Sequence, residues 1–240
     1  NQDFQETAVR LDAESLLPAG ELGKLWQQNF QAAAKRIDGA LLQSPKLPPF
    51  AYEIPFDGQT LQGSLGNLYQ CGQVFYLDRK PNAPQRIAPQ RIALLLEHLI
   101  FCAVGPSETE TRQTHIVQPE ETTLYPEIPS SHAQQMLQKW LTFFNLGQTR
   151  PLPFFAKTSL AAAEAYGKKQ SWEDALNKAR TEYHGNKVSK GQKDYTEVEL
   201  VFGDEDTGPI EEVLFRRLTE ELLVPLLDAV ENSQSVEKAV

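Results

Sequence analysis

The fold of this chain is decided by Leu61-Gln-Gly-Ser-Leu-Gly-Asn-Leu-Tyr69 and by Val74-Phe-Tyr-Leu-Asp78-Arg79-Lys80. A Gln-Cys-Gly-Gln turn separates these stretches, and the pattern predicts two antiparallel strands at about 60–69 and 73–79. Because side chains alternate between the faces of a strand, Asp78 and Lys80 share one face. A metal-dependent phosphodiesterase uses such groups, since carboxylates hold Mg²⁺ and a lysine lies near the attacking water.

The partner strand lacks the second carboxylate that such a site requires. No acid occurs from Leu65 to Asn67, and the expected position is occupied by Gly66. About one or two acid-x-lysine triplets are expected by chance in a chain with these charge counts, so the spacing alone is a weak signal. Glu53 or Asp57 could replace the lost ligand, but a solvated edge strand and a turn aspartate are the favoured interpretation of these two acids.

The remaining pattern predicts an α/β protein. A helix begins near Gly20, a short extended run covers 51–56, and the apolar run 92–104 indicates a buried helix after the two main strands. Further strands are predicted at 112–117 and 122–125, and 195–202 is predicted as a strand or an irregular segment. Further helices are predicted at 130–144, 158–166, 171–184 and 209–223. Ser130 or Ser131 is expected to cap the first of these helices, and Ser171 the third. We expect one domain over 1–240, with a core at about 18–125 and a helical half at about 130–230. Its fold class would be a mixed sheet flanked by helices, with additional C-terminal helices.

Composition restricts the functional classes. The 240 residues are 40% hydrophobic and carry a net charge of −9, which argues against an overall basic coat but permits a local basic groove. Two cysteines, Cys71 and Cys102, fit no zinc spacing or disulfide framework, which favours a reducing cytoplasm. No apolar run is long enough for a membrane span, and no nucleotide-binding loop or cofactor motif occurs. The missing initial Met predicts a piece of a larger chain.

Two groups of basic residues could contact phosphates without reading sequence, or could only keep the protein in solution. The candidates for DNA binding are Arg79, Lys80, Arg86 and Arg91 in one group, and Lys187, Lys190 and Lys193 in the other.

The ordered set of segments resembles a known family. The two opening stretches are similar to the nuclease motif of the RecB family, which is of the restriction-endonuclease type, PD-(D/E)xK. Further segments resemble the C-terminal domain of RecC, the gamma chain of exodeoxyribonuclease V: Leu17-Pro-Ala-Gly-Glu-Leu-Gly-Lys-Leu-Trp26, Leu96-Glu-His-Leu-Ile-Phe-Cys-Ala103, Pro151-Leu-Pro-Phe-Phe155, Lys190-Gly-Gln-Lys-Asp-Tyr195 and Phe215 to Leu226. The resemblance implies a restriction-endonuclease-like fold without nuclease activity. The domain would hold RecB-like and RecD-like subunits together and guide DNA strands in double-strand break repair.

The resemblance also assigns the vestigial site residue by residue. Asp78 and Lys80 match the motif, whereas Gly66 and Lys24 stand where active relatives carry metal ligands, so we expect no catalytic residue and no bound metal. The alternative is an active Mg²⁺-dependent nuclease with a relocated ligand. A third possibility, an AddB-type nuclease domain, is disfavoured because two cysteines cannot supply an iron–sulfur set.

Overall fold

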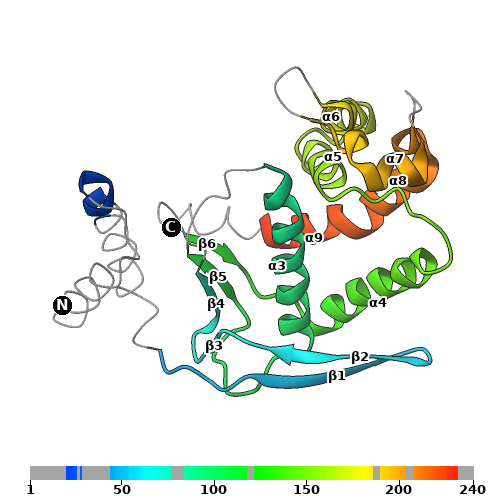
Figure 1. Cartoon of the computed structure of the whole chain (residues 1–240). Helices are drawn as coiled ribbons and strands as arrows, with labels where there is room; N and C mark the ends of the chain where they lie inside the picture. The colour runs from blue at the N-terminus through cyan, green and yellow to red at the C-terminus, as the bar shows by residue number, and fades with distance from the viewer. Residues whose placement is uncertain are drawn as a thin grey trace.

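A computed structural model describes residues 20–25, 28, 44–76, 84–117, 122–185, 190–203 and 208–231. A two-stranded hairpin and a four-stranded sheet form one part of the molecule, and C-terminal helices form the other. One long helix, α3, lies between the four-stranded sheet and these helices (Figure 1). Helical residues 21–25 and 28 lie in the predicted first helix, whose other residues fall outside the described ranges. No described helix has both the length and the apolar character that a membrane crossing needs.

The hairpin consists of β1 (Phe50–Phe56) and β2 (Gln59–Leu65). Asp57-Gly58 makes the predicted turn, and Gly58 adopts a φ of +79° that glycine tolerates without strain. Tyr52 lies over its cross-strand partner Gly63, where a Cβ would come within 2.6 Å of the tyrosine hydroxyl. The missing side chain therefore gives the ring its place on the hairpin.

The predicted strand at 60–69 is wrong as one continuous element. The chain breaks at Gly66 and Asn67, and only the two residues of β3 (Leu68–Tyr69) pair with β4 (Gly72–Tyr76). Asn67 has a φ of +54°, a left-handed conformation that asparagine adopts more readily than most residues. This local turn sends the two halves of one apolar pattern into two different sheets, which strand periodicity alone does not reveal.

The second sheet has the order β3-β4-β5-β6, with β5 at Thr114–Val117 and β6 at Thr122–Tyr125. Strands β4 and β5 are parallel, and α3 (Pro84–Val104) makes the crossover between them. The helix starts earlier than predicted. Pro84 opens it, where a missing N–H needs no partner, and Pro89 lies inside it instead of before it.

Side chains from distant segments satisfy the last carbonyls of α3. The Arg112 guanidinium donates to the carbonyls of Cys102 (2.7 Å) and Gly105 (3.1 Å), and the Ser130 hydroxyl donates to the carbonyl of Ala103 (2.7 Å). The prediction that Ser130 or Ser131 caps the next helix is therefore wrong. In α4 (Ser130–Gly147) the N-cap is Pro129, whose carbonyl accepts from two backbone N–H groups.

The main hydrophobic core lies where α3 meets the sheet, the hairpin and the C-terminal helices. Leu95 and Leu99 of α3 are fully buried there, together with Leu226 near the end of the described chain. The last helical stretch comprises α8 (Val213–Leu218), a π-helical turn (η3, Thr219–Leu223) and α9 (Val224–Glu231). Its wide apolar face is turned inward and closes the core.

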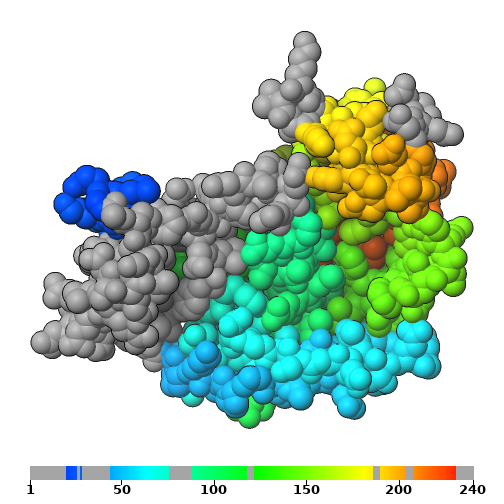
Figure 2. All heavy atoms as spheres, viewed as in Figure 1, coloured from blue at the N-terminus to red at the C-terminus, as the bar shows by residue number. Residues whose placement is uncertain are grey.

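A smaller lobe stands on the C-terminal side. It contains α5 (Ala156–Lys169), α6 (Trp172–His184), η1 (Gln192–Asp194), α7 (Thr196–Phe202), η2 (Pro209–Glu211) and α8. The predicted cap of α6 is confirmed, since the Ser171 hydroxyl accepts from the Asp174 N–H, whereas 195–202 forms helix α7 and not a strand. Figure 2 shows this lobe above α4, with the hairpin along the opposite edge of the same face.

Candidate functional site

Gly66 lies at the junction where the chain leaves the hairpin and joins the four-stranded sheet. Its carbonyl accepts from the side-chain amide of Gln73 on β4 at 3.1 Å. A Cβ added at Gly66 would meet no atom within 4 Å, and no positive φ requires glycine there. A side chain could therefore begin at this position without a clash at its Cβ, and neither the local space nor the backbone geometry requires glycine here.

Glu97 is the carboxylate that sequence reasoning undervalued. It projects from α3 toward the junction, and its Oε1 accepts from the same Gln73 amide at 3.0 Å. Partial burial raises the pKa of Glu97, and the hydrogen bond from Gln73 opposes that shift. It was detectable in the sequence as the single acid within the apolar run 92–104.

Tyr52 extends this polar cluster from the hairpin. Burial raises the pKa of its hydroxyl, and the nearby negative charge of Glu97 raises it further. The Gly66 junction, Gln73 of β4, Glu97 of α3 and Tyr52 of the hairpin thus meet in one place. The cluster combines one carboxylate with neutral polar groups, a set that offers few strong ligands to a divalent cation.

The other proposed ligands do not converge on this junction. Glu53 is exposed opposite Gln62 on the hairpin, and Asp57 is exposed in its turn. Lys24 pairs with Glu21 at 2.8 Å on an exposed helical turn. Asp78 and Lys80 lie outside the described residues. Over the part of the chain that the structure describes, no three His, Cys, Asp or Glu side chains are grouped so that they could hold a metal ion.

His98, next to Glu97 on α3, is packed in the protein interior. It is fully buried, and its Nε2 contacts the carbonyl of Pro126 at 2.9 Å while its Nδ1 contacts the hydroxyl of Thr114 at 2.8 Å. A carbonyl only accepts, so Nε2 carries the proton and Nδ1 accepts from Thr114. Burial lowers the pKa of His98 to about 4, which keeps the ring neutral at physiological pH.

Cys102 lies one turn further along α3 and is also occupied. Its thiol donates to the carbonyl of Arg112 and accepts from the N–H of Ile128, both at 3.4 Å. Burial raises the pKa of the thiol to about 11, so it stays protonated. This cysteine is a buried hydrogen-bonding group that ties the end of α3 to two loops, and it is not a reactive thiolate.

The structure describes three of the seven candidate DNA-binding side chains. Arg91 of α3 pairs with Glu164 of α5, so a neighbouring carboxylate already offsets its charge. Lys190 is exposed, and Lys193 is half-buried. The side chains of Arg79, Lys80, Arg86 and Lys187 fall outside the described residues. The two predicted basic groups are thus represented by Arg91 at the start of α3 and by Lys190 and Lys193 beside α6.

One comparison with known protein families gives a match, and it spans the residues that form the Gly66 junction. A family model described as the RecC C-terminal domain matches residues 1–167. This span contains the hairpin, the sheet, the Gly66 junction, α3, α4 and most of α5. No curated protein sequence matches the chain.

Proposed function

The chain belongs to the RecC C-terminal domain family, and on this premise we propose that it is a non-catalytic, nuclease-like domain of a RecC-type subunit. It would work in the cytoplasm within a RecBCD-type helicase–nuclease, exodeoxyribonuclease V. There it would hold RecB-like and RecD-like subunits together and guide DNA strands during double-strand break repair. The family match over 1–167 is the observation that carries this proposal.

The connectivity of the sheet supports a nuclease-like ancestry. A short antiparallel pair, β3 and β4, is followed by α3 and by the parallel strand β5. In the restriction-endonuclease-like arrangement expected from the sequence, the first strand of the pair carries the metal-binding acid and the second strand ends in the acid-x-lysine. Gly66 and Asp78 stand at these two places in the chain.

The chemistry around Gly66 supports the absence of catalysis. Phosphodiester cleavage at a Mg²⁺ site requires oxygen ligands that hold the metal and place the attacking water. At Gly66 the Gln73 amide bonds both to the Gly66 carbonyl and to Oε1 of the half-buried Glu97, so both oxygens are already engaged by a hydrogen-bond donor. The role left to the domain is to bind partners and DNA.

Calorimetric titration with Mg²⁺ and Mn²⁺, together with a cleavage assay on linear DNA, tests the inactive site. We expect no saturable binding and no cleavage. Metal-dependent cleavage that disappears in Asp78→Ala would overturn the proposal in favour of a nuclease with a relocated ligand such as Glu53 or Asp57. Gly66→Asp is the informative gain-of-ligand variant, because the added side chain has room.

Strand guidance has a separate test on the full subunit. Phosphate contacts by Lys190, Lys193 and the Arg79–Lys80 pair release counterions, so DNA affinity should fall steeply as salt rises. Lys190→Glu with Lys193→Glu should reduce both the affinity and the slope. The matched control, Lys139→Glu with Lys168→Glu, changes the same net charge at exposed positions elsewhere on the molecule. DNA affinity that does not change between low and moderate salt would refute direct phosphate contact.

A further inference from the structure

Large apolar side chains are exposed on the outer side of the C-terminal lobe. Leu200 is 81% exposed and Val201 52% exposed on α7, and Val213 at the start of α8 is 83% exposed. The inner sides of the same helices are already used, since Val198 and Phe202 of α7 and Phe215 of α8 pack in the small core of the lobe. Helix α7 therefore carries apolar residues on both its buried and its solvent side.

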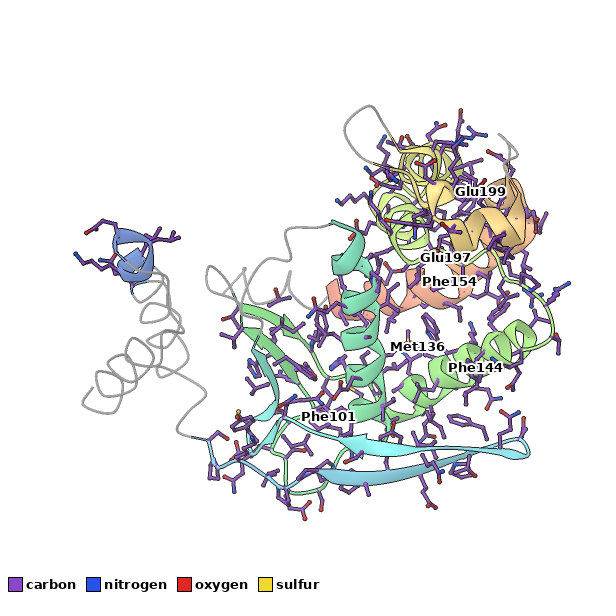
Figure 3. All side chains as sticks on the ribbon, viewed as in Figure 1. Phe101, Met136, Phe144, Phe154, Glu197 and Glu199 are labelled. Atoms are coloured by element: carbon purple, nitrogen blue, oxygen red, sulfur yellow. The ribbon has the colours of Figure 1, made fainter. Side chains whose placement is uncertain are left out.

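The segment that carries these residues is acidic. The chain from Asp194 to Glu212 has eight Asp or Glu residues and no Lys or Arg; three of these acids, at 204–206, lie outside the described residues, and Glu211 pairs with Arg180 of α6 at 2.7 Å. Glu197, Glu199 and Glu212 are exposed, and the first two lie on α7 (Figure 3). The next basic residues, Arg216 and Arg217, bond to Glu220 and Glu221 at 2.9 and 2.6 Å, so their charges are largely offset.

This combination of charge and apolar surface selects one kind of partner. Phosphate backbones and anionic lipid surfaces are repelled by such a face. A protein segment with apolar side chains flanked by Lys and Arg complements it, because the apolar residues can bury Leu200 and Val213 while the charges pair with the glutamates.

We propose that the acidic apolar face, formed by Glu197, Glu199, Leu200, Val201, Glu212 and Val213, docks a basic amphipathic segment of a partner subunit. The inference rests on the proposed function, which supplies such subunits. It also extends that function, because the face lies beyond residues 1–167, where the family model matches. Within one subunit, the described lysines beside α6 would serve DNA and this face would serve protein assembly.

The experiment reconstitutes the full RecC-type subunit with purified RecB-like and RecD-like subunits and measures complex affinity. Glu197→Lys with Glu199→Lys should weaken assembly by about tenfold or more, as expected for loss of central charge pairs, and wild-type assembly should weaken with salt. Leu200→Asp with Val213→Asp should weaken it to a similar degree. The matched controls Glu108→Lys with Glu110→Lys, and Phe144→Asp, alter exposed residues elsewhere and should change affinity less than about twofold.

The outcomes separate the two proposals. If the wild-type subunit fails to assemble, the proposed function is wrong, and this docking role falls with it. If the wild type assembles and both double variants assemble equally well, only the docking face is overturned. Loss of DNA binding in Leu200→Asp with Val213→Asp, with assembly unchanged, would assign the face to nucleic acid and also overturn the inference. Circular dichroism and melting temperature establish that each variant is folded.

Discussion

The region around α3 and the C-terminal lobe place their polar groups differently. Around α3, polar side chains are turned inward: Gln73, His98 and Thr114 are fully buried and hydrogen-bonded to one another or to backbone. In the lobe, the core is made mainly of alanines and aromatic rings, with Thr158 and Ser159 of α5 also buried. Its charged side chains form pairs, one of them largely buried (Lys157 with Glu182) and others at the surface, such as Arg180 with Glu211. A buried polar network whose members are hydrogen-bonded makes the core around α3 rigid. Charge pairs near the surface of the lobe contribute less, because solvent screens them.

The largest expected effect comes from removing Phe101, which packs against Leu65 and Leu68 on either side of the Gly66 break. Phe101→Ala should lower the free energy of unfolding by about 3–5 kcal/mol, because the ring is fully buried and leaves a cavity. Urea denaturation measures this difference. Phe144→Ala is the control, since Phe144 is 62% exposed and its loss should cost less than about 0.5 kcal/mol. Equal effects of the two variants would contradict the packing at the junction.

The second effect is the pH dependence that His98 imposes on stability. Above pH 6.5 both the folded and unfolded states hold a neutral ring. Between pH 6.5 and about 4 only the unfolded state gains the proton, because burial lowers the pKa in the folded state. The stabilisation lost over this range is roughly 3 kcal/mol. Titration by NMR should show a neutral His98 ring at pH 5, and a ring that titrates near pH 6.5 would refute the buried network.

The third prediction concerns the pH dependence of stability that Glu182 imposes on the C-terminal lobe. Glu182 accepts from Lys157 of α5 at 2.7 Å and from Lys178 at 2.8 Å. Burial by itself raises the pKa of Glu182, but the two lysines outweigh it and lower the pKa. Glu182 therefore stabilises the folded protein at pH values above the pKa that it has in the unfolded chain. This stabilisation is lost as the pH falls through the lower pKa that Glu182 has in the folded protein.

Glu182→Gln should cost about 1 kcal/mol at pH 7 after solvent screening, and the difference should vanish in acid. Chemical denaturation at pH 7 and pH 3 measures this. A difference that persists at low pH would mean that packing, not charge, carries the contribution of Glu182.

The smallest change in the free energy of unfolding is expected at Glu97. Its dependence on pH has the opposite sign to that of Glu182. Because burial raises the pKa of Glu97, the ionised carboxylate is disfavoured in the folded state, and stability declines as pH rises above the unfolded pKa. Glu97→Gln should therefore stabilise the protein slightly at pH 7, by about 1 kcal/mol or less, and have no effect in acid. Destabilisation at pH 7 would indicate that the charge itself holds the junction together.

Sequence reasoning found most of the elements but only part of the candidate site. The apolar run 92–104 identified α3, and the turn dipeptide Asp57-Gly58 identified the hairpin, because both signals are local. The break after Gly66 was missed because Asn67 changes the chain direction without interrupting the apolar pattern. Glu97 was undervalued because its significance depends on Gln73 and Tyr52, which lie 24 and 45 residues away in the chain.

The sequence by itself determined the membership of the family and the glycine at position 66, because a residue type is fixed without reference to its neighbours. It also determined the long acidic stretch in the lobe, since charge count needs no coordinates. Only the tertiary structure decided that Glu97 reaches the junction, that Arg91 is already paired, and that α7 exposes Leu200. Each of these depends on which distant segments pack together, and that packing follows from the burial of the whole core and not from any local pattern.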